Sequence, residues 1–388
     1  MRAYLDHAAT TPMVPAAIEA MTAQLGLVGN PSSLHSSGRA ARRVVEESRE
    51  TVAALLHASP AEVIFTSGGT EADNLAVQGA YAASARTAGR SRVVISAVEH
   101  HAVLDPARAL ADRAGADLVE VPVTTEGRVD VEALAAAVDE RTAVVSVMWA
   151  NNEVGTLQPV VDVARIARAA GALSHADAVQ AVGHVPVDFA ASGLDLLTVS
   201  AHKLGGPVGV GALLARREAA LEPVQHGGGQ ERDLRSGTLD AVAVAGFAAA
   251  LQVAVSSAEV ERERLESLRS GLVDTVLAVV PEAVVHGPAD PGARLPGILN
   301  VELPGCSSEA LLLLFDAAGI DCSTGSACSA GVTAPSHVLL ALGRTDAQAR
   351  SALRFSLGHS STRADVDALA ATLPDVLARA RAFGGVAR

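Results

Sequence analysis

The chain has 388 residues, of which 49% are hydrophobic and 2% aromatic, and its formal net charge is −13 at pH 7. One hydrophobic core rarely organises this many residues, so we expect two packed units. The acidic charge repels a polyanion, and no run of five or more Lys and Arg offsets it, which argues against direct nucleic-acid binding. The first residues, MRAYLDHAATTP, lack the continuous apolar core of a secretory signal, and three cysteines cannot form a full disulfide framework. We therefore expect a cytoplasmic protein.

Short apolar runs alternate with helical patterns over residues 1–220, which is typical of β-α-β units. A helix is predicted over 39–57, where Val45, Val52 and Leu56 recur on one side and charged residues occupy the rest. Continuous β-rich runs at 63–66, 93–96, 143–149 and 194–199 predict strands that are covered on both faces. A parallel sheet between helices follows from this pattern.

Residues 241–258 contain no charge and have the minimum length of a membrane span. Many alanines, a glutamine and two serines make the run weakly hydrophobic, so a buried helix between layers is the better interpretation. Beyond 258 the sequence becomes highly charged, which suggests a hinge helix that leads into a second unit. A last helix is predicted over 365–383, with an apolar side that packs on this unit.

Polar residues follow the ends of the predicted strands, where α/β sheets bind their ligands. In VIFTSGGTEADN, Gly68 and Gly69 let the backbone approach an anion, and Thr70 begins a helix with free N–H groups. A phosphate fits this turn. An ordinary strand-to-helix turn would have a similar sequence, since neither the P-loop lysine nor the dinucleotide spacing is present.

His100 and His101 follow the strand at 93–96, and Asn151 and Asn152 follow the strand at 143–149. Adjacent side chains point in different directions, so the histidines favour one site residue and one solvent residue over a metal pair. No metal site is predicted. The asparagines could bind a ligand or only stabilise a turn.

Asp177 and Lys203 are the two charged residues that end apolar segments. A carboxylate at the position of Asp177 needs a cationic partner to stay ionised, and a protonated pyridine nitrogen is such a partner. A lysine that leaves a strand into a glycine-rich bend could form a Schiff base, although a structural salt bridge is the alternative. An anion cradle, a carboxylate and a lysine are together what pyridoxal 5'-phosphate requires of a protein.

The sequence resembles the group I cysteine desulfurases of the NifS/IscS type, which are fold-type I pyridoxal-phosphate enzymes. The resemblance covers nearly the whole chain through YLDHAATTP, GNPSSLH, TSGGTEADN, EHHAVLD, NNEVGT, HADAVQ, SAHKLGGPVGVG, HGGGQERDLRSGT, STGSACSAG and RFSLG. TSGGTE departs from the commoner TSGATE, and Cys322 is unusual. The resemblance implies an α/β fold with a large, mainly parallel-sheet domain over 14–257 and a smaller α+β domain formed by 1–13 and 258–388.

The resemblance also implies roles for individual residues. Lys203 would carry the cofactor and move protons, His100 would stack on the ring and assist proton transfer, and Cys328 would accept sulfur. The implied cofactor contacts are Gly69, Thr70, Asn152, Asp177, Gln180, Ser200, His202 and, from the neighbouring subunit, Thr238. Arg354, helped by Asn30, would bind the substrate carboxylate.

The implied reaction converts L-cysteine to L-alanine and leaves a persulfide on Cys328. The homodimer would then pass sulfur to an iron–sulfur scaffold or a tRNA-thiolation enzyme. Cys306 is interpreted as a buried small hydrophobe, and Cys322 as structural or as a redox partner of Cys328. A selenocysteine lyase or an aminotransferase would share Lys203 and Asp177 without needing Cys328, and a non-enzymatic scaffold would bind no cofactor.

Overall fold

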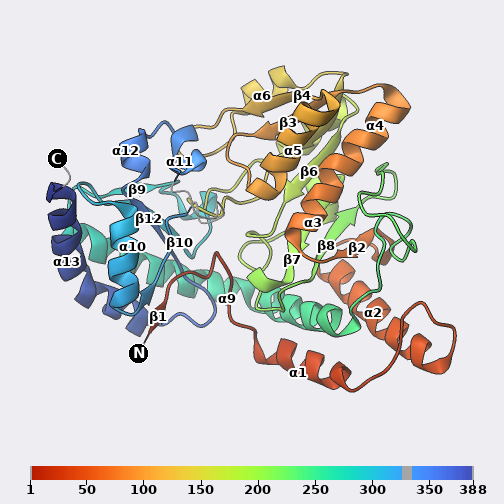
Figure 1. The fold of residues 1–388 in the computed structure, drawn as a ribbon, viewed down its shortest axis with the longest axis horizontal. Helices are drawn as coiled ribbons and strands as arrows, with labels where there is room; N and C mark the ends of the chain where they lie inside the picture. The colour runs from red at the N-terminus through yellow and green to blue at the C-terminus, as the bar shows by residue number, and fades with distance from the viewer. Residues whose placement is uncertain (1, 326–333, 387–388) are drawn as a thin grey trace.

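A computed structural model describes residues 2–325 and 334–386 of the chain. Cys328 lies outside the described residues, so its predicted role is not addressed by the structure. The described chain contains one large sheet with helices on both faces and a second unit built around a smaller sheet (Figure 1). The expected α/β fold with a mainly parallel large sheet and an α+β second unit is confirmed.

The large sheet has seven strands in the order β2-β8-β7-β6-β5-β3-β4. These are β2 (Val63–Thr66), β3 (Arg92–Ser96), β4 (Asp117–Val121), β5 (Thr142–Ser146), β6 (Leu173–Asp177), β7 (Leu196–Ser200) and β8 (Gly211–Ala215). Strand β8 pairs antiparallel with both neighbours, whereas the pairs among β3 to β7 are parallel. The predicted strands at 63–66 and 93–96 are confirmed. Strand β5 ends at Ser146, earlier than the predicted 149, and β7 begins at Leu196, later than the predicted 194.

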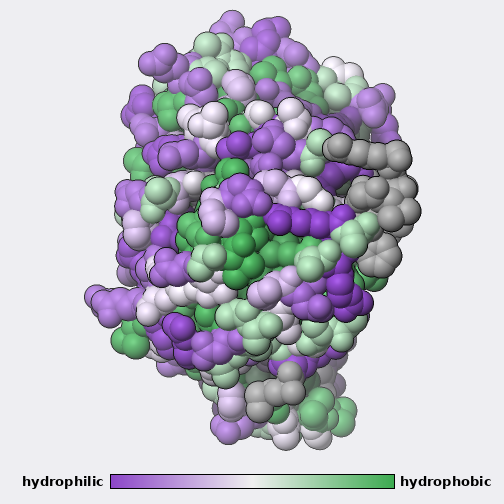
Figure 2. All heavy atoms as spheres, turned by 90° about the vertical axis from the view of Figure 1, so that its left-hand side faces the viewer, coloured by the Kyte–Doolittle hydropathy of each residue, from purple (hydrophilic) through white to green (hydrophobic). Residues whose placement is uncertain are grey.

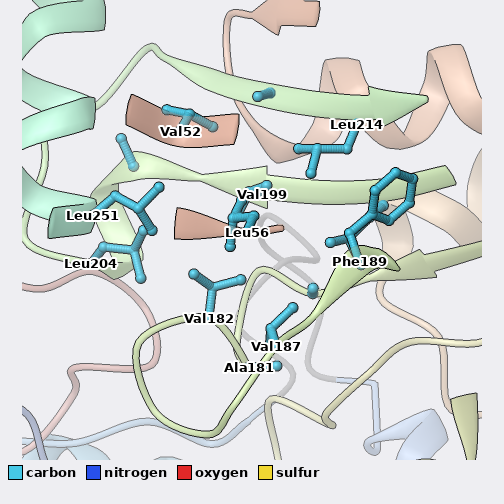
Figure 3. Packing of buried hydrophobic residues seen from close by; sticks show 14 of the residues in the cluster. Val52, Leu56, Ala181, Val182, Val187, Phe189, Val199, Leu204, Leu214 and Leu251 are labelled. Atoms are coloured by element: carbon cyan, nitrogen blue, oxygen red, sulfur yellow. The ribbon is translucent and has the colours of Figure 1, made fainter. Parts of the chain in front are cut away.

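Side chains alternate between the two faces of this sheet, and a different set of helices covers each face. Val52 from α2 (Ser36–Leu55), Leu56 just after it and Leu251 from α9 (Ala241–Val279) pack against Val199 and Leu214 on one face (Figure 3). Helices α3, α4 and α5 cover the other face. The helices of this unit are α1 (Pro15–Leu25), α2 (Ser36–Leu55), α3 (Gly69–Asn74), α4 (Ala80–Ala88), α5 (His101–Ala114), α6 (Val131–Ala137), α7 (Val160–Ala169) and α8 (Phe189–Ser192).

Helix α9 (Ala241–Val279) connects the two units and runs unbroken through residue 258. The helix is long and apolar enough to cross a membrane by length and composition alone, a test that core helices also pass. Ala243, Val244 and Phe247 are buried in the core of the large unit, whereas Val253 is exposed, so the predicted buried helix between layers is confirmed only for the first part of this run. Because the helix continues past 258, the predicted domain boundary there stays a prediction.

The second unit contains an antiparallel sheet of order β12-β10-β9 and a parallel pair of β1 and β11. Its elements are β1 (Ala3–Tyr4), β9 (Val284–His286), β10 (Ile298–Glu302), β11 (Ile320–Asp321), β12 (Ala352–Ser356), α10 (Ser308–Ala317), α11 (His337–Ala341), α12 (Asp346–Ala349) and α13 (Arg363–Val386). Leu5 packs in the same cluster as Phe315 and Phe355, so the first residues lie with the last hundred. Figure 2 views this end of the molecule and shows hydrophobic residues gathered within a largely hydrophilic face.

The last helix, α13, is longer than the predicted helix over 365–383. Val366, Leu369, Leu373 and Leu377 are buried on its inner side, as predicted. Cys306 is buried in the apolar cluster of the second unit, which confirms its interpretation as a small hydrophobe.

Candidate active site

A cavity of about 390 Å³ lies at the carboxyl ends of the parallel strands, between the large sheet and the second unit. This is the place where open α/β sheets bind ligands. Its walls come from residues after β2, β3, β5, β6 and β7, together with the N-terminal segment and β12. The described lining comprises Ala8, Ala9, Gly69, Thr70, Asp73, His100, Ala102, Met148, Asn152, Asp177, Val179, Gln180, Ser200, His202, Lys203, Gly325 and Arg354.

Lys203 ends a short 3-10 turn, Ala201–Lys203, which directly follows β7. Its Nζ donates hydrogen bonds to the backbone oxygens of Ala8, at 2.6 Å, and of Ala9, at 2.7 Å. The N-terminal segment therefore positions the amine in the cavity. Burial, and then the Lys203 charge, lower the pKa of neighbouring His202 to about 4, so this imidazole is neutral at pH 7.

Asp177 is the last residue of β6, and its Oδ1 accepts a hydrogen bond of 2.8 Å from the Val179 N–H. Burial raises the pKa of this carboxyl to about 6, while that hydrogen bond and the Lys203 charge act in the opposite direction. A buried acid of this kind favours a cationic partner in the cavity. Gln180 lies beside it and donates from Nε2 to the Ala8 oxygen at 2.9 Å.

Gly68 and Gly69 form the turn from β2 into α3, as the sequence predicted. Gly68 has φ 148°, a conformation that favours glycine, and α3 begins at Gly69. A Cβ on Gly69 would lie 3.0 Å from Val179 Cγ2 and 3.6 Å from Ser200 Cβ. The absence of that methyl group leaves backbone N–H groups at the helix start open to the cavity, which is the geometry of an anion cradle.

His100 lines the cavity and caps helix α5, whose Ala102 N–H donates to His100 Nδ1 at 3.1 Å. Nδ1 is therefore the acceptor, which leaves Nε2 as the protonated nitrogen of the neutral ring. Burial, followed by the charge of Lys203, lowers the pKa of His100 to about 4. His101 is outside the lining and lies 3.0 Å from Asp105, so the predicted division between the two histidines is confirmed.

Arg354 reaches the cavity from β12 in the second unit. Its side chain is 4% exposed, and its two terminal nitrogens donate to the backbone oxygen of Asn152 at 2.9 Å and to Asp6 Oδ1 at 2.8 Å. Its Nε has no hydrogen-bond partner within the described part of the chain. The guanidinium is thus positioned to bind a second carboxylate.

Two predicted site residues, Asn30 and Thr238, are not brought together with the others, and a third lies outside the described residues. Asn30 is exposed and its Oδ1 accepts a hydrogen bond from the Ser32 N–H, while Thr238 is exposed in the segment before α9. Neither lines the cavity as the described residues form it, and Cys328 is outside those residues. Their roles stay predictions. Cys322 is buried, and burial raises the pKa of its thiol to about 12, which fits its structural interpretation.

Sequence reasoning missed Asp6, the backbone oxygens of Ala8 and Ala9, and Asp73. Asp6 and the two alanines lie in YLDHAATTP, which was noticed as a motif but given no role. Asp73 lies between Glu71 and Asn74 in α3, so no local pattern marks it as a buried acid. No group of three or more His, Cys, Asp or Glu able to hold a metal occurs in the ranges 2–325 and 334–386.

A mainly parallel sheet with a lysine, a carboxylate and an anion cradle at its carboxyl edge defines a fold-type I enzyme. The profile of the family "Aminotransferase class-V" matches residues 3–369, and the chain belongs to this family. The chain is 53% identical to an IscS-like cysteine desulfurase of Mycobacterium tuberculosis over 98% of this chain and 97% of that protein. It is 43% identical to a cysteine desulfurase of Cereibacter sphaeroides, with the same two coverages.

Solved structures give the same picture. A NifS-like protein superposes with a TM-score of 0.90 at 36% identity and covers 98% of this chain and 100% of its own. A NifS-like protein from Rickettsia africae superposes with a TM-score of 0.86 at 31% identity, covering 97% and 99%. The similarity therefore extends over both units and includes the cavity between them.

Proposed function

We propose that the chain is a pyridoxal-phosphate-dependent cysteine desulfurase that converts L-cysteine to L-alanine and leaves the sulfur as a persulfide on Cys328. The observation that carries the proposal is that ten predicted site residues, distant in sequence, line one cavity around Lys203. The high identity to proteins named cysteine desulfurase over nearly the full length supports this activity.

The cavity fits the cofactor by four features of its walls. Gly69 leaves room for a phosphate where a Cβ would crowd Val179. Asp177 is a buried carboxyl suited to a pyridinium nitrogen, and Lys203 provides the amine for covalent attachment. His100 has a flat imidazole ring, neutral at pH 7, that can stack on a heteroaromatic plane. When bound, the cofactor would supply an electron-withdrawing ring that acidifies the substrate Cα–H bond.

Residues of the chain would then have separate roles in the reaction of L-cysteine. Arg354 would hold the substrate carboxylate, and Lys203 would take the proton from Cα. His100, with its proton on Nε2, would give and take protons at the substrate. The transfer is balanced without an external oxidant: the Cβ–S bond breaks, the sulfur joins Cys328 as S–SH, and Cβ receives the hydrogen that completes alanine.

Mass spectrometry after addition of L-cysteine tests the proposal. We expect one extra sulfur on Cys328 and one alanine for each sulfur transferred to an acceptor thiol. A Cys328→Ala enzyme that releases sulfide at the parent rate would contradict the role of Cys328. A selenocysteine lyase would instead turn over selenocysteine equally well with and without Cys328.

We infer that the enzyme acts as a homodimer in the cytoplasm and passes sulfur to an iron–sulfur scaffold or a tRNA-thiolation enzyme. A dimer is supported by large apolar side chains that are strongly exposed at the end of α1 and just after it, namely Leu25, Leu27, Val28 and Leu34. A second copy over this surface would also supply Thr238, which does not reach the cavity of its own chain. Light scattering on the parent and on a Leu27→Glu variant tests this: a parent that is monomeric at every concentration would contradict it.

A further inference from the structure

Asp73 is a buried carboxyl that lines the cavity beside Asp177 and has no part in the chemistry proposed above. It lies on α3, is 1% exposed, and its Oδ1 has no hydrogen-bond partner among the described residues. Acids are rarely buried so completely unless they are paired or hold a proton. The surroundings of Asp73 indicate which of these applies.

Strand alternation directs a set of polar side chains toward Asp73. His175 and Asp177 are two residues apart on β6 and thus point to the same face of the sheet, while Ala176 packs on the opposite face. Thr198 on β7 is the register partner of Asp177. This is the face that α3 covers, so Asp73 lies next to these side chains in the wall of the cavity.

The contacts form a connected chain of groups. Asp73 Oδ1 lies 3.6 Å from His175 Nε2, and the Thr198 hydroxyl hydrogen-bonds to the Asp73 carboxyl and lies 3.1 Å from the same nitrogen. His175 Nδ1 lies 2.8 Å from Ser146 Oγ. His175 is fully buried, and burial lowers its pKa to about 3, so it is a neutral ring and gives Asp73 no counter-charge.

Two carboxyls share this region of low dielectric, and their surroundings are unequal. Asp177 has the Val179 N–H as a hydrogen-bond donor and feels the charge of Lys203, both of which favour its ionised form. Asp73 has only a hydroxyl donor, and burial raises its pKa well above the ordinary value, with a further contribution from Asp177. Glu99 is the third acid nearby, and burial raises its pKa to about 8. These unequal surroundings favour the negative charge on Asp177 over Asp73.

We propose that Asp73 is a positioning residue that keeps its proton. With Thr198 and His175 it forms an uncharged hydrogen-bonded group next to Asp177, so that the negative charge in this part of the cavity wall lies on Asp177. The relevance of this charge to catalysis rests on the proposed function, because the pyridinium nitrogen is the group that would face Asp177. A second negative charge at Asp73 would compete for that cation and would lie in the protein interior with only the Thr198 hydroxyl as a donor.

Infrared difference spectroscopy measures the protonation state of Asp73 directly. The spectrum of the cofactor-loaded parent minus that of Asp73→Asn at pH 7 should show the carbonyl stretch of a protonated carboxyl, which moves to lower frequency in D₂O. The parent minus Glu99→Gln identifies any second protonated carboxyl. A carboxylate band in the Asp73 difference would overturn the proposal.

Cofactor affinity distinguishes the positioning role from a merely structural one. Asp73→Asn keeps a neutral group of the same shape and should bind pyridoxal phosphate within about threefold of the parent. Asp73→Ala removes the partner of Thr198 and His175 and should bind about tenfold more weakly. Asp177→Asn is the matched control, because it neutralises the neighbouring acid and should lose affinity where Asp73→Asn does not. Equal losses in the two Asn variants would overturn the proposal.

Two further measurements test the proposal if a variant does not fold or the chain binds no cofactor. If Asp73→Asn does not fold, Thr198→Val serves instead, since losing its hydroxyl should shift the protonated-carboxyl band, and an unshifted band would contradict the contact. The infrared experiment is repeated on cofactor-free protein. A chain that binds no cofactor would refute the proposed function, whereas the infrared result would still decide the protonation of Asp73.

Discussion

Replacing Asp6 by Asn should destabilise the cofactor-free protein and make its cavity a better carboxylate site. Asp6 is the only carboxylate paired with Arg354 among the ion pairs of the described chain, at 2.8 Å, and the side chains are 22% and 4% exposed. Removing one partner of a fully buried ion pair costs about 3–5 kcal/mol. Because Asp6 is partly exposed and the Asn152 oxygen still accepts one N–H of Arg354, we expect a smaller loss, about 2 kcal/mol.

The assay is thermal unfolding of the cofactor-free parent and Asp6→Asn, with and without a small carboxylate such as propionate. Asp367→Asn is the control, because Asp367 pairs with Arg363 one turn earlier on the same helix, and their side chains are 61% and 69% exposed. The loss of this pair should cost less than about 0.5 kcal/mol. Propionate should stabilise Asp6→Asn more than the parent, since it replaces the missing carboxylate. If Asp6→Asn is no less stable than Asp367→Asn, or if propionate favours the parent, the assigned role of the pair is wrong.

Three other outcomes follow from the described contacts. Gly69→Ala places a methyl 3.0 Å from Val179 Cγ2 and should cost about 1 kcal/mol, and Gly69→Ala combined with Val179→Ala should cost less than the sum of the two single variants in denaturant unfolding. The pKa of His100 is about 4 in the folded chain against 6.5 when exposed, so the unfolded chain takes up the His100 proton first as the pH falls. The contribution of neutral His100 to stability is therefore present above pH 6.5 and is lost as the pH falls to about 4. His100→Gln should flatten that part of a profile of unfolding free energy against pH. Glu231→Gln breaks a bidentate pair with Arg49, at 2.7 Å for both contacts, and should cost about 3 kcal/mol; a loss no larger than that of an exposed pair would contradict this.

The sequence predicted the parts of the fold that burial controls directly. Strands β2 and β3 are continuous apolar runs because helices cover both of their faces, and the polar residue after each strand marks the ligand edge. Ten of the predicted site residues therefore line one cavity, while their individual roles stay predictions. The antiparallel position of β8 depends on its long-range pairing with β2, which no local pattern contains. The unbroken course of α9 past residue 258 depends on its packing against both units.

The residues that were missed carry weaker sequence signals. A backbone oxygen has no side-chain signature, so the Ala8 and Ala9 contacts of Lys203 emerge only when the N-terminal segment is folded over the cavity. Asp73 follows Glu71 by two positions in a helix, where an acid is ordinarily expected to face solvent. Thr238 could be linked to the site only by resemblance, because it does not line the cavity that the described residues form.

The N-terminal segment joins the two groups that would bind opposite ends of an amino acid. Asp6 pairs with Arg354, the Ala8 N–H donates to Ser356 Oγ at 2.9 Å, and the Ala8 oxygen accepts from Lys203. A substrate carboxylate that binds Arg354 competes with Asp6, and an amine that replaces Lys203 on the cofactor changes the contact with Ala8. Asp6 and Ala8 are two residues apart on one backbone, so the contacts of Arg354 and of Lys203 lie on the same short segment. The segment thus links the arginine of the second unit to the lysine on the large sheet.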